Sequence, residues 1–123
     1  MSDYSTQLLL PSIYHGVPQG NYDGSSASFT GPTVEASSYY SGITNGQQTI
    51  AISASQFLGV ISIQATLERN PEEDDWVTIY EYGDYSSAIS ENSMTTLLGN
   101  YVWLRANVNY FETGIINEVR AIY

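Results

Sequence analysis

The sequence predicts an all-β protein: an antiparallel β-sandwich or jelly roll with an extended, irregular N-terminal arm. From Gln48 onward, apolar and polar side chains alternate with a period of two, which is typical of half-buried strands. Turn residues separate the alternating stretches, and no convincing amphipathic helix interrupts them. Many short strands with turns between them favour a sandwich or a jelly roll.

Residues 1–47 differ from the rest, and we expect them to form the arm of a single domain whose sandwich spans residues 48–123. They are rich in Gly, Ser and Asn and show no sustained period, yet they hold aromatic residues that disordered tails usually lack. We therefore expect an ordered arm that lies over its own domain or over a neighbour's. The stretch QLLLPSIY is expected to add a short edge strand that Pro11 ends. The predicted arm contacts are Tyr14, Tyr22, Tyr39 and Tyr40.

Alternation defines five stretches of the predicted sandwich: residues 48–55, 60–67, 76–82, 101–108 and 114–123. Burial of their aliphatic side is expected to drive folding. The aliphatic residues directed inward are Ile50, Ile52, Ala54, Ile61, Ile63, Ala65, Leu67, Val77, Ile79, Val102, Leu104, Ala106 and Val108. Turns are expected at the ends of these stretches, at Gly59, Gly83, Gly99 and Gly114.

The opposite side of two of these strands carries aromatic rings and a guanidinium, from Trp76, Tyr80, Tyr82, Tyr101, Trp103 and Arg105. If the two strands are neighbours, these side chains form a patch larger than soluble monomers usually expose. Three interpretations stay open: the rings are core, the arm or a partner subunit covers them, or they form a ligand platform. Arg105 is expected to stack on a ring or to fork onto a carboxylate, in a structural role more than in ligand capture.

The acidic stretch ERNPEEDD, residues 68–75, raises the question of a metal site. Its consecutive carboxylates offer the oxygens that Ca²⁺ accepts, but their spacing does not match an EF-hand loop. Asn70-Pro71 favours a turn, so we interpret the stretch as a hairpin connection without a metal.

No motif points to catalysis. His15 is the single histidine, and no G-x-S-x-G elbow or Gly-rich phosphate-binding loop is present. We therefore predict no catalytic residues and no cofactor, and a protein that is not an enzyme.

The charge balance bears on the partners. Lysine is absent, and three arginines stand against thirteen carboxylates, which gives a net charge of −10. Nucleic acids and anionic membranes attract basic proteins, so neither is an expected partner. No apolar run approaches the length of a membrane span, no basic leader opens the chain, and the absence of cysteine excludes disulfides.

Three stretches carry a resemblance: YHGVPQGNYDGSS, FLGVISIQATLERNPEEDDWVTIYEYGD and GNYVWLRANVNYFETGIINEVRAIY. Together they cover about half of the chain, and they resemble small β-sandwich virion proteins of tailed bacteriophages, especially marine, cyanophage-like ones. The order of strands, tryptophan and arginine is also similar to that of discoidin-type jelly rolls, although no ligand motif of those domains is present.

The phage resemblance implies a non-enzymatic structural protein, made in the host cytoplasm and located in the virion as a capsid decoration or a neck, tail or baseplate component. Its expected partners are other virion proteins and further copies of itself, in a closed oligomer such as a trimer. The alternative is a carbohydrate-binding module or fibre-tip adhesin in which the Tyr and Trp rings stack on sugars.

Overall fold

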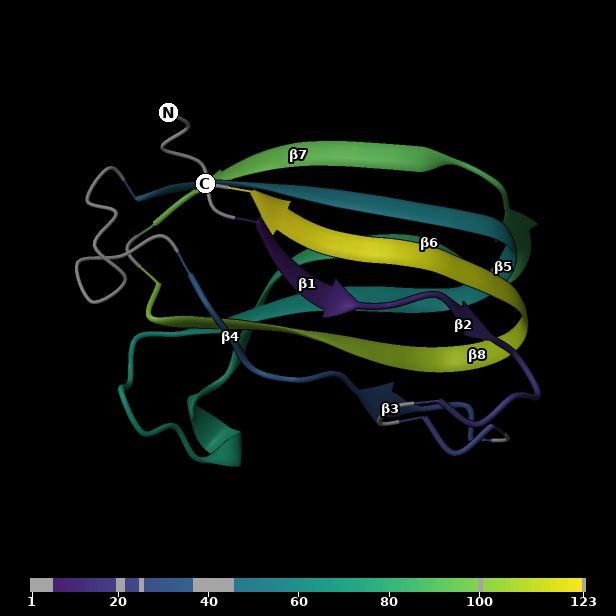
Figure 1. Cartoon of the computed structure of the whole chain (residues 1–123), viewed down its shortest axis with the longest axis horizontal. Coiled ribbons are helices and arrows are strands. Elements are labelled where there is room, and N and C mark those ends of the chain that lie inside the picture. The colour runs from purple at the N-terminus through teal and green to yellow at the C-terminus, as the bar shows by residue number, and fades with distance from the viewer. Residues whose placement is uncertain (1–5, 20–21, 25, 37–45, 100, 123) are drawn as a thin grey trace.

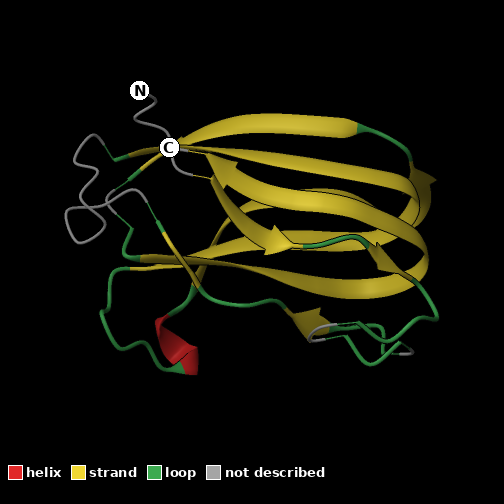
Figure 2. Ribbon diagram, in the orientation of Figure 1, coloured by secondary structure: helices red, strands yellow, loops and turns green. Residues whose placement is uncertain are grey.

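The computed structural model describes residues 6–19, 22–24, 26–36, 46–99 and 101–122. It confirms the all-β prediction, because the strands form an open antiparallel sheet and no α-helix occurs in these residues (Figures 1 and 2). A single 3₁₀ turn, Glu73–Asp75, is the one helical element among them. The strands are β1 (Thr6–Leu10), β2 (Ile13–Tyr14), β3 (Phe29–Thr30), β4 (Val34–Glu35), β5 (Gln47–Thr66), β6 (Val77–Ile89), β7 (Asn92–Leu98) and β8 (Trp103–Ile122).

Two long strands, β5 and β8, organise the sheet. Each has 20 residues, and they pair with each other along most of their length, from Thr49↔Ile122 to Thr66↔Trp103. Both curve back at the same end of the molecule, so each has a half on either side of a bend (Figure 1). On one side of the bend, β7 pairs with the first half of β5 and β1 pairs with the end of β8. On the other side, β6 pairs with the second half of β5. The strands thus belong to one folded sheet, and the jelly-roll connectivity stays a prediction.

The bends are built from residues with unusual backbone angles. Gln56 in β5 and Tyr110 in β8 have positive φ angles of 50° and 57°, and the β5–β8 register shifts there. Gly114 has a φ of 100°, and a Cβ at this position would overlap the Gln56 carbonyl oxygen across the bend. Three of the glycines expected at turns between separate strands, Gly59, Gly83 and Gly114, therefore lie inside continuous strands instead.

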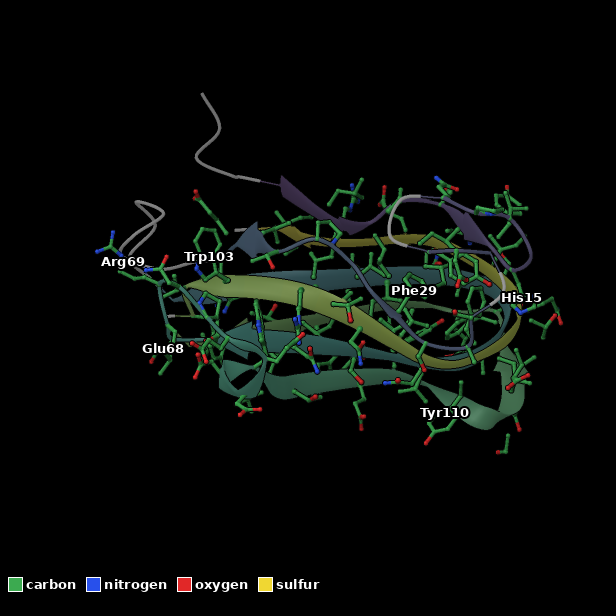
Figure 3. All side chains as sticks on the ribbon, turned by 90° about the horizontal axis from the view of Figure 1, so that it is seen from below. His15, Phe29, Glu68, Arg69, Trp103 and Tyr110 are labelled. Atoms are coloured by element: carbon green, nitrogen blue, oxygen red, sulfur yellow. The ribbon has the colours of Figure 1, made fainter. Side chains whose placement is uncertain are left out.

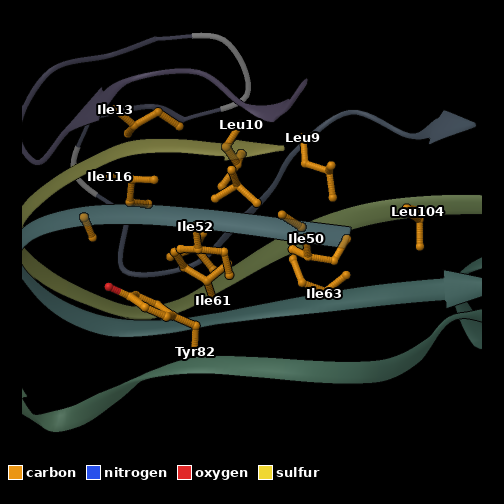
Figure 4. Packing of buried hydrophobic residues seen from close by; sticks show 14 of the residues in the cluster. Leu9, Leu10, Ile13, Ile50, Ile52, Ile61, Ile63, Tyr82, Leu104 and Ile116 are labelled. Carbon is orange, nitrogen blue, oxygen red and sulfur yellow. The ribbon is translucent and has the colours of Figure 1, made fainter. Parts of the chain in front are cut away.

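The core lies between the two halves of the folded sheet (Figure 4). Ile50 and Ile52 come from the first half of β5, Ile61 and Ile63 from the second half, and all four are at most 1% exposed. Each fully buried aliphatic side chain of this kind contributes roughly 1.5–3 kcal/mol. The predicted inward positions of the alternating stretches are confirmed for β5 and β8, with the exception of Leu67, which lies in the loop after β5 and is exposed.

The described N-terminal segments lie along β8. The expected edge strand is present as β1, which pairs with β8 from Thr6↔Ile122 and ends just before Pro11. β2, β3 and β4 pair with successive parts of the same strand. Apolar side chains of these segments belong to the core: Leu9, Leu10, Ile13, Tyr22, Phe29 and Ala36. They cover the chain's own core.

A β-bulge in β6 overturns the predicted orientation of its side chains. Ile63 pairs with Tyr80, and the next residue of β5, Gln64, pairs with Thr78, so Ile79 is an extra residue on β6. One extra residue exchanges the two faces of a strand. Tyr80 and Tyr82 therefore point toward the core, and Ile79, which was predicted to lie inside, is partly buried and also packs against the core. Val77, expected inside, lies at the start of the strand and is exposed.

The strand β7 was not expected from the sequence. It pairs with the first half of β5 over its whole length, from Gln47↔Leu98 to Ser53↔Asn92. Its inward positions include Thr95, opposite the buried Ile50, so a polar residue stands where the alternation would need an aliphatic one. No helix in the described residues is long and apolar enough to cross a membrane.

Candidate functional site

The most structured group of polar and aromatic side chains lies on the outer surface of the second half of the sheet, and we call it the polar–aromatic face. It consists of Gln64 from β5, Trp103 and Arg105 from β8, and Glu73 and Trp76 from the β5–β6 connection. β5 lies between β6 and β8, so the two strands that carry the predicted patch are not neighbours. Trp103 pairs with Thr66, and Trp76 precedes Val77, the partner of Ala65. The two tryptophans therefore flank the end of β5 from opposite sides.

Arg105 is the centre of this face. Its Nε donates a hydrogen bond of 2.7 Å to Gln64 Oε1 on the neighbouring strand. Nη2 and Nη1 reach the two carboxylate oxygens of Glu73 at 2.9 and 3.4 Å. The guanidinium carbon lies 4.3 Å from the centroid of the Trp76 ring. The sequence predicted stacking or a carboxylate fork for Arg105, and the structure contains both.

The guanidinium is well packed, with its side chain 13% exposed, whereas the side chain of Glu73 is 78% exposed. The hydrogen bond from Arg105 and its positive charge lower the pKa of the Glu73 carboxyl below its usual value. Because Glu73 stands in solvent, the pair acts mainly to hold the loop against the sheet. Arg105 thus connects a strand, a loop and a ring.

Trp103 is fixed in the same region. Its indole Nε1 donates a hydrogen bond of 2.9 Å to the carbonyl oxygen of Arg69. Figure 3 shows Trp103 near Arg69 and Glu68 at one end of the molecule, with His15 and Tyr110 at the other end. Both tryptophans are half-buried, so each still offers part of its ring to the surface.

A row of polar side chains continues the face away from the tryptophans. Thr30, Asn107, Ser62 and Glu81 follow one another across β3, β8, β5 and β6. The Thr30 hydroxyl donates to Asn107 Oδ1 at 2.8 Å, and the Ser62 hydroxyl lies 3.4 Å from Glu81 Oε2. These contacts order the row, in which Ser62 is buried, Thr30 and Asn107 are partly buried and Glu81 is exposed.

Three residues that the sequence assigned to this face lie elsewhere. Tyr82 is 6% exposed and donates a hydrogen bond of 2.7 Å to the carbonyl oxygen of Glu91. Burial, and next the charge of Glu91, raise the pKa of its phenol. Tyr80 packs against the core, and its hydroxyl lies 2.8 Å from the Ser93 hydroxyl. Tyr101 precedes β8, so it does not follow the alternation of that strand, and its ring packs beside Gly99 and against the core.

The predicted arm contacts also differ in their burial. Tyr22 is 2% exposed and packs on Phe29 and Phe111, with ring centroids 4.7 and 5.4 Å away. Its hydroxyl is buried without a hydrogen-bond partner in the described residues. Tyr14 is half-exposed on β2. Tyr39 and Tyr40 lie outside the described residues.

The acidic connection between β5 and β6, residues 68–75, is held by hydrogen bonds and an ion pair of its own side chains. β5 and β6 are antiparallel neighbours, which confirms the hairpin interpretation of residues 68–75. Asp75 Oδ2 accepts a hydrogen bond of 2.8 Å from the Glu72 amide, and Glu73 binds Arg105. Within the described ranges, no group of three or more His, Asp or Glu side chains is placed to hold a metal ion.

No protein-family model, no curated protein and no solved structure matches this chain. Sequence analysis missed Gln64 and Glu73 as partners of Arg105. Gln64 alternates with the buried Ile63 and Ala65, so the sequence pattern agrees with its outward position, but only the fold of the connection brings Glu73 back to the sheet.

Proposed function

We propose that this chain is a non-enzymatic structural protein of a tailed-phage virion, a capsid decoration or a neck, tail or baseplate component. It contacts neighbouring virion proteins through the polar–aromatic face. In this proposal residues 48–123 form a sandwich-like shell and the N-terminal 47 residues serve as its arm. The phage assignment depends on the sequence resemblance.

The observation that carries the contact role is the fixed presentation of Trp76, Trp103 and Arg105 at one surface. Tryptophan and arginine are enriched where protein surfaces meet, and a few such residues usually dominate the binding energy. Side chains already held in place lose little conformational entropy on binding. A net charge of −10 also suits a position on the outside of a particle better than contact with packaged DNA.

Two measurements test the proposal. Mass spectrometry of purified virions should find the protein, and its absence would end the virion assignment. In phage that carry Trp103→Ala, the amount of this protein per particle should fall at least about tenfold if the side chain is an interface hot spot. Tyr110→Ala is the comparison, because Tyr110 is an exposed aromatic residue of β8 at the other end of the molecule (Figure 3). Equal incorporation of both variants would exclude the polar–aromatic face as the contact.

The alternative, a carbohydrate-binding module or fibre-tip adhesin, draws support from the polar row from Thr30 to Glu81, which continues the polar–aromatic face. Sugar rings stack on such aromatic side chains while neighbouring polar groups bind hydroxyls. A glycan array with the purified protein separates the two functions. A saturable signal that Trp103→Ala removes supports the adhesin, whereas a structural subunit gives none.

A further inference from the structure

The edges of the sheet differ in how they are protected. Apart from the two-residue strands β2 to β4, three described strands pair on one side only: β1, β6 and β7. β1 has a register shift between Leu8 and Leu10 and is followed by Pro11. β6 has register shifts at both ends of its pairing and carries Glu81. Bulges, prolines and charges of this kind prevent an edge from pairing with another chain.

β7 lacks all of these protections. Its sequence, NSMTTLL, has no charge and no proline, and its pairing with β5 runs through all seven residues without a shift. Met94 is 79% exposed and Leu98 is 71% exposed. Figure 1 shows β7 as the outermost strand of its layer. The backbone groups on its outer side therefore offer a template for a further strand.

A shallow depression lies beside this edge. It has a volume of about 220 Å³ and extends from β7 across β5 to β8, with Asn92 and Met94 at the β7 side and the ion-paired Glu118 and Arg120 at the β8 side. Asn92 stands at one end of β7 and Leu98 at the other. In a pair of antiparallel β7 strands, Leu98 of each copy would lie opposite Asn92 of the other, at the rim of the depression. The strand thus carries an exposed apolar side chain that the pairing would place beside this depression.

The distribution of charge on the chain favours a second copy as the partner of β7. A chain with a net charge of −10 repels its own copies over most of its surface. The uncharged β7 is a place where two copies can meet without setting carboxylates of the paired strands against each other. An antiparallel strand pair also has the two-fold symmetry that is commonest among homo-oligomers. We propose that two copies of this chain pair antiparallel along β7 and join their sheets across a two-fold axis.

Full overlap of the seven residues defines the register. Thr95 lies on the axis, and Met94 of one copy lies opposite Thr96 of the other. Directly opposed residues in antiparallel strands have Cα atoms about 4.5–5.5 Å apart, which a disulfide can bridge. The chain contains no cysteine, so introduced thiols can react only with each other. Both positions are exposed, so a substitution there leaves the core unchanged.

The experiment mixes two single variants, Met94→Cys and Thr96→Cys, that carry different affinity tags. Under mild oxidation we expect a cross-linked dimer that contains one chain of each kind, formed at least about tenfold faster than the dimers of either variant alone. The matched control replaces one member of the mixture by Leu67→Cys, whose side chain is 67% exposed and lies outside β7. If the control mixture cross-links as fast, or if no mixed dimer forms, the proposal is wrong.

Sedimentation of the unmodified protein gives a second measurement. We expect a concentration-dependent monomer–dimer equilibrium that Met94→Lys weakens at least about tenfold and Leu67→Lys leaves unchanged. Circular dichroism confirms that both variants keep the strand content. A protein that stays monomeric up to about 1 mM, or a dimer that Met94→Lys does not weaken, would overturn the pairing. A trimer, the ring suggested by the phage resemblance, would do so as well.

Discussion

Replacing Arg105 by lysine tests how the polar–aromatic face is held. The substitution keeps the positive charge but removes the planar fork, so the hydrogen bond from Nε to Gln64 and the two-pronged contact with Glu73 cannot both persist. The flat stacking on Trp76 is also lost in part. We expect the variant to fold and to be less stable.

The size of the effect follows from the exposure of each contact. The ion pair with the solvent-exposed Glu73 contributes little to stability, and lysine keeps part of it. The partly buried hydrogen bond to Gln64 contributes about 1 kcal/mol, and stacking on Trp76 about 0.5–1 kcal/mol. The expected loss is therefore about 1–2 kcal/mol, which for a chain of 123 residues lowers the melting temperature by about 4–8 °C.

Thermal unfolding followed by circular dichroism measures this loss, and tryptophan fluorescence reports the change around Trp76. Arg120→Lys is the matched control, because Arg120 pairs with Glu118 at 3.2 Å while both side chains are nearly half exposed. We expect the control to stay within about 0.5 kcal/mol of the natural protein. If Arg105→Lys melts like the natural protein or like the control, the guanidinium does not hold the loop and ring as described.

Three further outcomes are expected. Because Arg105 lowers the folded-state pKa of Glu73, the pair stabilises the fold above the unfolded-state pKa, and this contribution is lost as the pH falls through the folded value; an NMR titration should show a higher Glu73 pKa in Arg105→Gln. Tyr82→Phe should lower the free energy of unfolding by about 0.5–1.5 kcal/mol, because the hydrogen bond to the Glu91 carbonyl oxygen is lost. Tyr22→Phe should leave it unchanged or raise it, because the Tyr22 hydroxyl is buried without a hydrogen-bond partner in the described residues. Urea unfolding compares the two variants. Gly114→Ala should cost more than about 1 kcal/mol, because its φ is positive and the bend leaves no room for a Cβ; equal midpoints in urea would contradict this.

The buried aliphatic side of β5 and β8 could be predicted because alternation is a local property of a strand. Ile50, Ile61 and Leu104 are buried as expected. The inward turn of Tyr80 and Tyr82 could not be predicted, because it depends on a single extra residue at Ile79 that leaves no local signal.

The positions of the bends and the partner of Arg105 also depend on contacts between distant segments, which a local pattern does not report. A glycine at a turn between two strands and a glycine at a bend inside one strand, such as Gly114, look alike in a sequence. The kind of partner that Arg105 needs was predictable from its chemistry. Its identity was not, because Glu73 reaches the sheet only through the path of the connection.

The position of β8 in the chain has a consequence for biosynthesis. β8 pairs with β1, β2, β3, β4 and β5, yet it is translated after all of them. The β5–β6 and β5–β7 pairs can form on the nascent chain, but Leu9 and Leu10 stay uncovered until β8 has left the ribosome. Pairing over such long sequence separations is slow and exposes apolar surface in the meantime. We therefore expect chains that stall before β8 to be retained by chaperones or degraded, and the native fold to close only after translation has passed β8.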